Sequence, residues 1–101
     1  MDEVAKDLAE SGAAAVGFNC VAADMMTPYL ITRLRRYVRG PLICKPNAGI
    51  PTINDSGIAE YHQTPEEFAA IVAQCKENGA AILGGCCGTA PEYIAALTAK
   101  L

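Results

Sequence analysis

Residues 79–92, which read GAAILGGCCGTAPE, place a glycine, a short apolar run, two adjacent cysteines and a Thr/Pro helix start in direct succession. A short, continuous apolar run is typical of a strand buried on both faces, and Pro is favoured in the first turn of a helix. The same order occurs earlier in the chain, where Gly12 and Cys20 stand at the same spacing as Gly79 and Cys87. Repeated units of strand and helix predict a parallel sheet.

The rest of the chain alternates between strands and helices in the same way. Apolar periodicity and capping signals predict four helices. They cover 2–11, then run from Thr27-Pro28 to Gly40-Pro41, from the capping box Thr64-Pro65-Glu66-Glu67 to Gly79, and from the box Thr89-Ala90-Pro91-Glu92 onward, with Ile94, Leu97 and Leu101 inward. Thr27, Thr64 and Thr89 are the expected N-caps. Strands are predicted at 13–19, 41–46 and 80–85, with a long loop over 47–63. We therefore expect an α/β fold in which three parallel strands pair in sequential order, with right-handed crossovers and helices on one side.

The composition limits the class of protein. The chain has 101 residues, of which 51% are hydrophobic and 19% charged, and its formal net charge is −3. This length allows one small domain, and the apolar content excludes a disordered segment. The negative charge argues against a nucleic-acid-binding protein, so the four arginines of the second helix are interpreted as a solvated face. No apolar run reaches the roughly 18 residues of a transmembrane helix, and Met1-Asp2-Glu3 is unlike a signal peptide, so we expect a cytoplasmic protein without membrane or nucleic-acid partners.

Five cysteines carry the main chemical signal. Their odd number without a secretory signal argues against a disulfide framework, and Cys44 and Cys75 lie on apolar segments where Cys acts as a small hydrophobe. Cys20, Cys86 and Cys87 instead follow predicted strands, and the carboxyl ends of parallel strands meet at one edge of a sheet. Three thiolates suit a Zn²⁺ ion with an open fourth position, whereas buried thiols or a vicinal redox pair are the alternatives.

Three motifs together resemble the homocysteine S-methyltransferase family. They are the stretch Gly84-Gly85-Cys86-Cys87-Gly88-Thr89 followed by Pro91-Glu92-Tyr93-Ile94, the segment Gly17-Phe18-Asn19-Cys20, and the loop Pro46-Asn47-Ala48-Gly49-Ile50-Pro51 with Tyr61 and Thr64-Pro65-Glu66 after it. Their order and spacing agree with the family throughout, and the resemblance covers nearly the whole chain. It implies a (β/α)8 barrel, of which residues 1–101 would supply the C-terminal three βα units of a homocysteine-binding domain.

The resemblance also implies a site and a reaction. Cys20, Cys86 and Cys87 would be zinc ligands, Asn47 would lie beside the metal and contact substrate or metal, and Gly49 and Tyr61 would complete the substrate-binding loop. The implied reaction is zinc-dependent methyl transfer to the thiol of homocysteine, which forms methionine. Methylcobalamin, betaine or S-methylmethionine would be the methyl donor. A zinc-bound thiol is deprotonated, and the thiolate is the nucleophile.

The length of the chain leaves a second interpretation open. A full barrel needs about 250 residues, so an N-terminal barrel segment, or corrinoid and folate modules of a parent protein, would be the missing partners. The alternative function is therefore a non-catalytic zinc-binding fragment or remnant of such an enzyme, and we expect the isolated chain to bind zinc weakly and transfer no methyl group. Neither His62, interpreted as an exposed loop residue, nor Asp24 is assigned a role.

Overall fold

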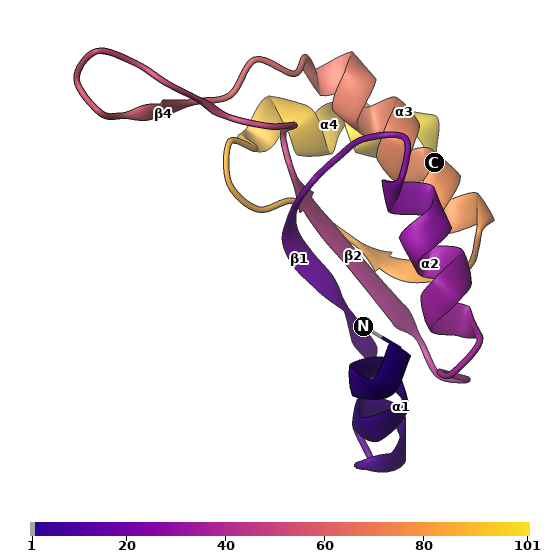
Figure 1. The fold of residues 1–101 in the computed structure, drawn as a ribbon. Coiled ribbons are helices and arrows are strands. Elements are labelled where there is room, and N and C mark those ends of the chain that lie inside the picture. The colour runs from indigo at the N-terminus through magenta and orange to yellow at the C-terminus, as the bar shows by residue number, and fades with distance from the viewer. Residues whose placement is uncertain (1) are drawn as a thin grey trace.

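Three parallel strands form the centre of the structure, a computed structural model that describes residues 2–101 (Figure 1). The strands β1 (Val16–Ala22), β2 (Leu42–Asn47) and β5 (Ala80–Leu83) pair in the order β1-β2-β5, and both pairings are parallel. The predicted sequential order and parallel pairing are therefore confirmed. The first strand begins three residues later than expected and extends through Cys20, so this cysteine lies within β1 and not beyond its end.

Helices cover one face of this sheet. The helices are α1 (Asp2–Glu10), α2 (Thr27–Arg35), α3 (Pro65–Glu77) and α4 (Pro91–Lys100). The two middle helices pack against the strands and against each other, α4 packs on α3, and α1 contacts β1 and α2 (Figure 1). Ile31, Leu42, Phe68 and Val72 are completely buried between these layers, whereas Ile82, on the uncovered face, is 45% exposed.

Cys44 on β2 and Cys75 on α3 belong to this core. Both side chains are completely buried, as the sequence predicts for cysteines that act as small hydrophobes. A hydrogen bond with Cys75, together with burial, raises the pKa of the Cys44 thiol. Because this thiol stays protonated and inaccessible, the two residues contribute to packing.

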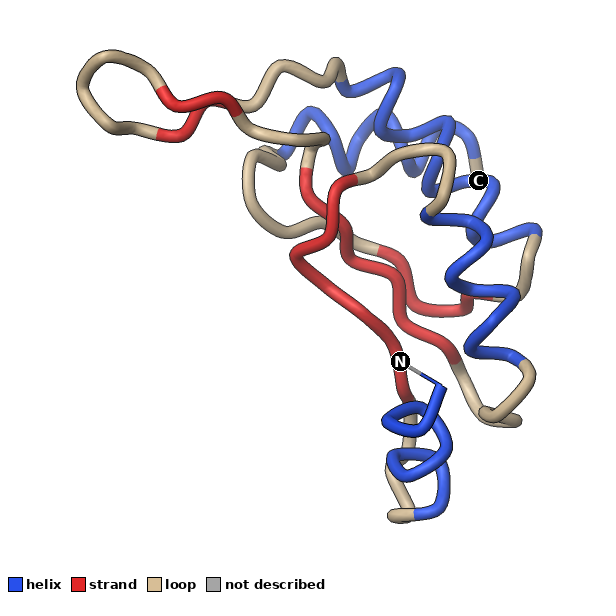
Figure 2. The backbone as a smooth tube through the Cα atoms, in the orientation of Figure 1, coloured by secondary structure: helices blue, strands red, loops and turns tan. Residues whose placement is uncertain are grey.

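The predicted loop over 47–63 contains a small hairpin. Its strands β3 (Thr52–Ile53) and β4 (Ala59–Glu60) pair antiparallel, and the hairpin extends away from the sheet and helices (Figure 2). Asn54 closes its turn, because the Asn54 side-chain oxygen accepts from the backbone N–H groups of Ser56 and Ile58 at 2.9 and 3.0 Å. An Asn side chain that caps a turn in this way gives the tip a defined conformation without help from a core.

Two of the three predicted helix caps are wrong. Thr64 does form the capping box with Glu67, but Thr27 is the first residue of α2 and the N-cap of α4 is Ala90. The hydroxyl of Thr27 donates to the carbonyl of Ala22 at 2.9 Å, and the hydroxyl of Thr89 donates to the carbonyl of Cys86 at 2.6 Å. The Thr27 hydroxyl thus bonds to the last residue of β1 and the Thr89 hydroxyl to the loop after β5, where the sequence predicts a bond from each to its own helix.

Helix α4 buries less of its apolar face than the sequence predicts. Leu97 is 3% exposed, but Ile94 and Leu101 are 42% and 54% exposed. The helix packs on α3, and only one side of it reaches that neighbour. The expectation that all three residues point inward is therefore wrong for two of them. Each helix among residues 2–101 is too short or too polar to cross a bilayer.

Arg33 and Arg35 are exceptions among the four arginines. Arg33 forms an ion pair with Asp2 of α1 at 2.7 Å. Arg35 holds the end of α2 in place. Its guanidinium donates to the carbonyl oxygens of three residues in the following turn and to that of Gly79, at 2.9–3.2 Å. These carbonyls face the guanidinium, so α2 ends at Arg35 and does not continue to Gly40-Pro41. The interpretation of the arginines as a purely solvated face is thus wrong for Arg33 and Arg35.

Gly17 allows β1 and β2 to pair closely, and this gives a test of the fold. A Cβ atom at Gly17 would lie 2.1 Å from the carbonyl oxygen of Ile43, which belongs to the backbone of the partner strand. We expect Gly17→Ala to reduce the free energy of unfolding by about 1–3 kcal/mol, because the strands must separate to accommodate the methyl group. Urea denaturation followed by circular dichroism measures this change.

Gly40→Ala is the matched control. A Cβ atom there would meet only the carbonyl oxygen of Ala14 at 3.6 Å, which is an ordinary contact. Its effect should stay within about 0.5 kcal/mol, as for most surface substitutions. Equal stability of Gly17→Ala and the unaltered chain would contradict the close strand pairing.

Candidate metal centre

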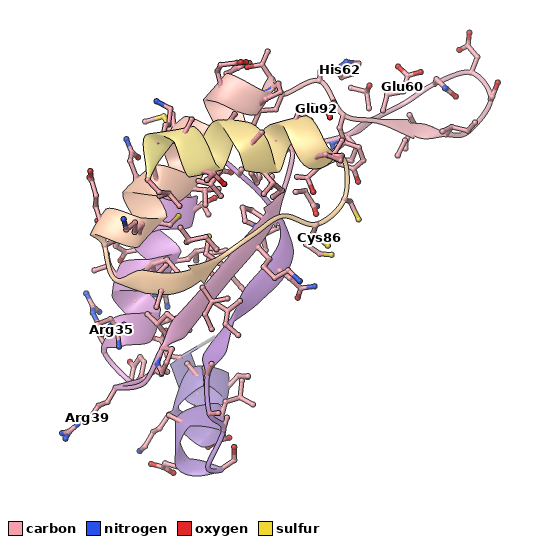
Figure 3. The ribbon with its side chains drawn as sticks, turned by 180° about the vertical axis from the view of Figure 1, so that it is seen from behind. Arg35, Arg39, Glu60, His62, Cys86 and Glu92 are labelled. Carbon is pink, nitrogen blue, oxygen red and sulfur yellow. The ribbon has the colours of Figure 1, made fainter. Side chains whose placement is uncertain are left out.

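Three cysteine thiols converge at the carboxyl ends of β1 and β5. The Sγ atoms of Cys20, Cys86 and Cys87 all lie within 4.8 Å of one another, close to the spacing of about 4 Å that a shared metal requires of its sulfur ligands. Figure 3 shows sulfur atoms gathered around Cys86 at this end of the sheet. These atoms come from two segments far apart in the chain, so the sheet itself creates the cluster.

A bulge in β1 turns Cys20 toward the other two cysteines. Asn19 pairs with Lys45 and Ala22 pairs with Asn47, so β1 holds one more residue than β2 over this interval. Cys20 lies in the extra stretch with φ of +57°, the left-handed region that non-glycine residues rarely adopt. The bulge therefore sets the direction of the Cys20 side chain, as bulges near functional sites commonly do.

The segment that carries Cys86 and Cys87 continues the backbone pairing of β5 with β2. Gly84 N donates to the carbonyl of Cys44 at 3.0 Å, and Cys86 N donates to that of Pro46 at 2.9 Å. One step further, Ala48 N donates to the carbonyl of Cys87 at 3.0 Å. Both cysteines are thus held by main-chain hydrogen bonds to the same neighbouring strand.

Glycines allow this segment to turn tightly. A Cβ atom at Gly85 would lie 2.5 Å from Oγ1 of Thr89, the hydroxyl that bonds to the carbonyl of Cys86. Gly88 has φ of +79°, and a Cβ atom there would lie 2.3 Å from Cγ of Tyr61. The ring of Tyr61 therefore rests directly against Gly88, beside the cysteine pair.

The three predicted substrate-binding residues lie around the cluster in different ways. Oδ1 of Asn47 accepts a hydrogen bond from the backbone N–H of Cys87 at 3.0 Å. The ring of Tyr61 lies against Gly88, the residue that follows Cys87, as described above. Gly49 turns the chain with φ of +82° and contacts Gln63, so it shapes the loop and is not itself in the thiol cluster.

His62 and Asp24 have local structural contacts. A ring nitrogen of His62 lies 2.7 Å from Oγ1 of Thr52 across the hairpin, and Figure 3 shows His62 well away from Cys86. Asp24 accepts a hydrogen bond from the backbone N–H of Met26 at 2.9 Å within the turn before α2. Neither side chain is part of the thiol cluster.

The thiols of Cys20 and Cys86 are hydrogen-bonded to each other, and this bond shifts the pKa values of both. A hydrogen bond to Cys86 raises the pKa of Cys20 to about 11, and the same hydrogen bond lowers the pKa of Cys86. Cys86 is therefore the first of this pair to ionise, because the Cys20 thiol donates a hydrogen bond that stabilises the Cys86 thiolate. Partial burial, and then the neighbouring Cys87, raise the pKa of Tyr61, so its phenol remains a neutral hydrogen-bond donor.

Asn19 lies in the site although the sequence does not predict it there. Its Nδ2 lies 3.6 Å from Sγ of Cys20, within hydrogen-bonding distance for sulfur. Alternation along a strand places consecutive side chains on opposite faces, so the periodicity conceals this contact. Only its position beside Cys20 in the segment Gly17-Phe18-Asn19-Cys20 could have indicated a role.

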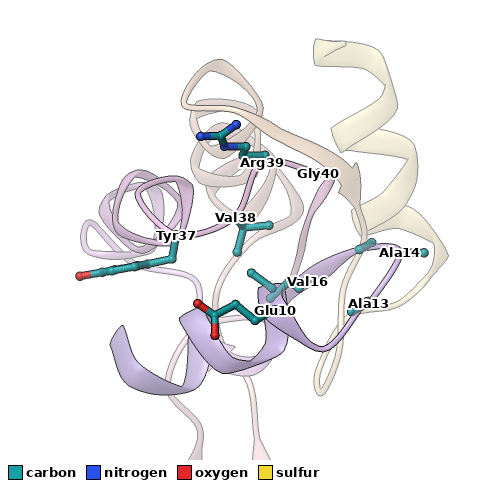
Figure 4. Close-up of a pocket in the computed structure, with 10 residues that line it drawn as sticks. Glu10, Ala13, Ala14, Val16, Tyr37, Val38, Arg39 and Gly40 are labelled. Atoms are coloured by element: carbon teal, nitrogen blue, oxygen red, sulfur yellow. The ribbon is translucent and has the colours of Figure 1, made fainter.

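The two larger hollows beside the sheet lie toward opposite ends of its strands. One of about 240 Å³ is lined by Gly17, Phe18, Asn19, Ile43 and Lys45, so it adjoins the thiol cluster through Asn19. The other, of about 290 Å³, lies at the amino ends of β1 and β2, where Glu10, Tyr37 and Arg39 are among its lining residues (Figure 4). The second hollow contains no cysteine and lies at the opposite end of the strands.

Comparison with known proteins identifies the family. The family model described as Homocysteine S-methyltransferase matches residues 1–101. The chain therefore belongs to the homocysteine S-methyltransferase family, as its motifs predict.

Individual relatives agree with this assignment. The chain is 36% identical over 87 residues to a methionine synthase of Mycobacterium tuberculosis, which covers 85% of this chain and 7% of that protein. It is 33% identical over 89 residues to homocysteine S-methyltransferase 3 of Arabidopsis thaliana, covering 86% of this chain and 25% of that protein. The chain thus spans a quarter or less of the length of these relatives.

A solved structure has the same arrangement of strands and helices. The oxidized form of the homocysteine methyltransferase MmuM from Escherichia coli superposes with a TM-score of 0.72 at 28% sequence identity. The superposition covers 99% of this chain and 30% of the other. The parallel α/β fold described above is therefore that of a homocysteine methyltransferase over this part of the molecule.

The hydrogen bond between Asn47 and Cys87 can be tested directly. Asn47→Ala removes the acceptor of the Cys87 backbone N–H, and a hydrogen bond of this kind contributes about 1 kcal/mol. We expect the Cys87 amide to exchange with solvent about fivefold faster, as measured by hydrogen exchange in NMR spectra. Asn54→Ala, which changes only the hairpin, should leave that rate unaltered, and an unchanged rate in Asn47→Ala would refute the contact.

Proposed function

We propose that Cys20, Cys86 and Cys87 bind a zinc ion, and that this site activates the thiol of homocysteine for methyl transfer, which forms methionine. The convergence of three Sγ atoms within 4.8 Å of one another carries the proposal. Tetrahedral zinc with Zn–S bonds of about 2.3 Å places its sulfur ligands about 3.8 Å apart. The three thiols thus need to approach by about 1 Å at most, which side-chain rotation can supply.

The donor set suits this chemistry. Three cysteine ligands leave one position for a substrate, the arrangement typical of catalytic rather than structural zinc. A zinc ion there would lower the pKa of a bound substrate thiol and so supply the nucleophilic thiolate at neutral pH. Free cysteines persist in a reducing compartment, which supports a cytoplasmic location for the protein.

The residues around the cluster would position the substrate. The carbonyl oxygen of the Asn47 side chain already accepts from Cys87, so its Nδ2 remains to donate to a substrate atom. Tyr61 borders the same space, held by its contact with Gly88. The turn at Gly49 would hold these two residues in register with the cysteines. The methyl donor would be methylcobalamin, betaine or S-methylmethionine.

A larger barrel would complete this site. The edges of β1 and β5 have no partner strand among residues 2–101, and the face that carries Ile82 has no covering helix there. Residues 1–101 would be the C-terminal three βα units of a (β/α)8 barrel. The remaining units, or corrinoid and folate modules of a parent protein, would provide the other walls of the substrate pocket.

The open sheet also favours a second candidate function. A site on a three-stranded sheet with two free edges lacks the surrounding structure that holds catalytic groups in place. By itself, the chain would then be a non-catalytic zinc-binding fragment of such an enzyme. Both candidates share the metal site and differ only in turnover.

Methionine formation separates the two candidates. We expect the chain alone to bind zinc weakly and to form no methionine with any of the three donors, because it lacks most of the barrel. A full-length parent at equal zinc loading should form methionine, and Cys86→Ala in the parent should abolish both zinc retention and turnover. Cys75→Ala, which alters a buried core thiol, should retain zinc. Turnover by the chain alone would instead indicate that several copies assemble into a closed barrel.

Zinc affinity should depend on pH in a definite direction. The pKa of Cys20 is raised to about 11, so this thiol is protonated at neutral pH and a metal ion must displace its proton. Zinc affinity is therefore expected to increase as the pH rises from about 6 to 8, by up to about tenfold per pH unit for each proton released. Competition with a chromophoric chelator measures it, and an affinity independent of pH would argue against thiolate ligands.

A further inference from the structure

Asn19 and Cys20 place their side chains together although they are consecutive in a strand. Consecutive strand residues normally point to opposite faces of a sheet. Here the bulge and the left-handed conformation of Cys20, with φ of +57°, bring its Sγ to within 3.6 Å of Nδ2 of Asn19. The same backbone irregularity that directs Cys20 toward Cys86 therefore also directs it toward the carboxamide of Asn19.

The carboxamide of Asn19 faces one sulfur atom of the cluster, with its Nδ2 3.6 Å from Sγ of Cys20. An Asn Nδ2 group has two N–H bonds and no acceptor capacity, so it acts only as a donor toward this sulfur. Hydrogen bonds to charged groups are stronger than those to neutral ones, so this donor suits a sulfur that binds a metal as a thiolate.

Packing does not account for the position of Asn19. The residue is exposed, and it lines the hollow of about 240 Å³ on the uncovered face of the sheet. A small polar side chain on such a surface adds little to the free energy of unfolding. Its contact with the cysteine sulfur is consequently the feature that needs an explanation.

We propose that Asn19 is a positioning residue of the metal centre, whose side-chain amide donates an N–H···S hydrogen bond to the sulfur atom of Cys20 and holds it toward the metal. This inference rests on the proposed metal site and assigns that site a residue that does not itself bind the metal. Partners of metal ligands commonly change metal affinity by 10–100-fold when removed. Their hydrogen bonds also draw electron density from the ligand sulfur.

Cobalt(II) titration of three variants tests the role of the amide. Asn19→Leu keeps the approximate volume without a donor, Asn19→Ala removes both, and Asn19→Ser keeps a short donor. We expect Asn19→Leu and Asn19→Ala to weaken cobalt binding about tenfold, and Asn19→Ser to weaken it by less than about threefold. The sulfur-to-cobalt charge-transfer band should move to longer wavelength in the Leu and Ala variants, because their thiolates are more electron-rich. Asn78→Leu, which removes a side-chain amide that donates to Pro28 on another part of the chain, is the matched control and should leave the band unchanged.

The results distinguish this inference from the proposal on which it rests. Wild-type chain that gives no cobalt–thiolate band would overturn the metal site, and the role of Asn19 with it. A normal wild-type band together with unchanged affinity and band position in all three variants would overturn the role of Asn19 alone. A third result also contradicts the inference. If Asn19→Leu binds cobalt as tightly as the wild type, whereas Asn19→Ser and Asn19→Ala bind it weakly, then Asn19 acts through its volume. Circular dichroism of each variant checks that the fold is retained.

Discussion

A single peptide group, between Asn47 and Ala48, joins the two halves of the thiol cluster. Its carbonyl accepts from Ala23 N at 3.1 Å, just after β1, and its N–H donates to the carbonyl of Cys87 at 3.0 Å. The segment with Cys20 and the segment with Cys87 are thus both fixed to the end of the central strand. Because a main-chain group makes both contacts, the arrangement depends on strand pairing and not on any one side chain.

The sequence predicted the features that depend on local pattern. Apolar runs after Gly12 and Gly79, together with helix signals between them, were sufficient for three parallel strands and for the meeting of Cys20 with Cys86 and Cys87. Features that depend on tertiary partners were not predictable. The hydroxyls of Thr27 and Thr89 bond to carbonyls that no capping pattern identifies.

The bulge shows most clearly why the rest of the site could not be predicted. In a sequence, a glycine usually marks a position whose backbone is left-handed, but this position holds Cys20. Period-two alternation then places Cys20 on the face opposite Asn19 and conceals the contact between Asn19 and the Cys20 sulfur. The departure from local preference occurs at the thiol cluster, and proteins commonly hold a strained backbone in place at functional sites through the surrounding structure.

The extra residue of β1 has a consequence for how such chains tolerate changes in length. Deletion of one residue between Asn19 and Ala22 would restore regular pairing with β2, which is normally a favourable change for a sheet. In this chain the deletion would make β1 more regular, but it would also turn the side chain of Cys20 away from Cys86 and Cys87. An insertion or deletion here thus separates foldability from chemistry, whereas the exposed hairpin tip around Asn54 can vary in length without touching the sulfurs. Gap placement in this one segment is therefore a practical criterion for recognising relatives that have kept the three-thiol cluster.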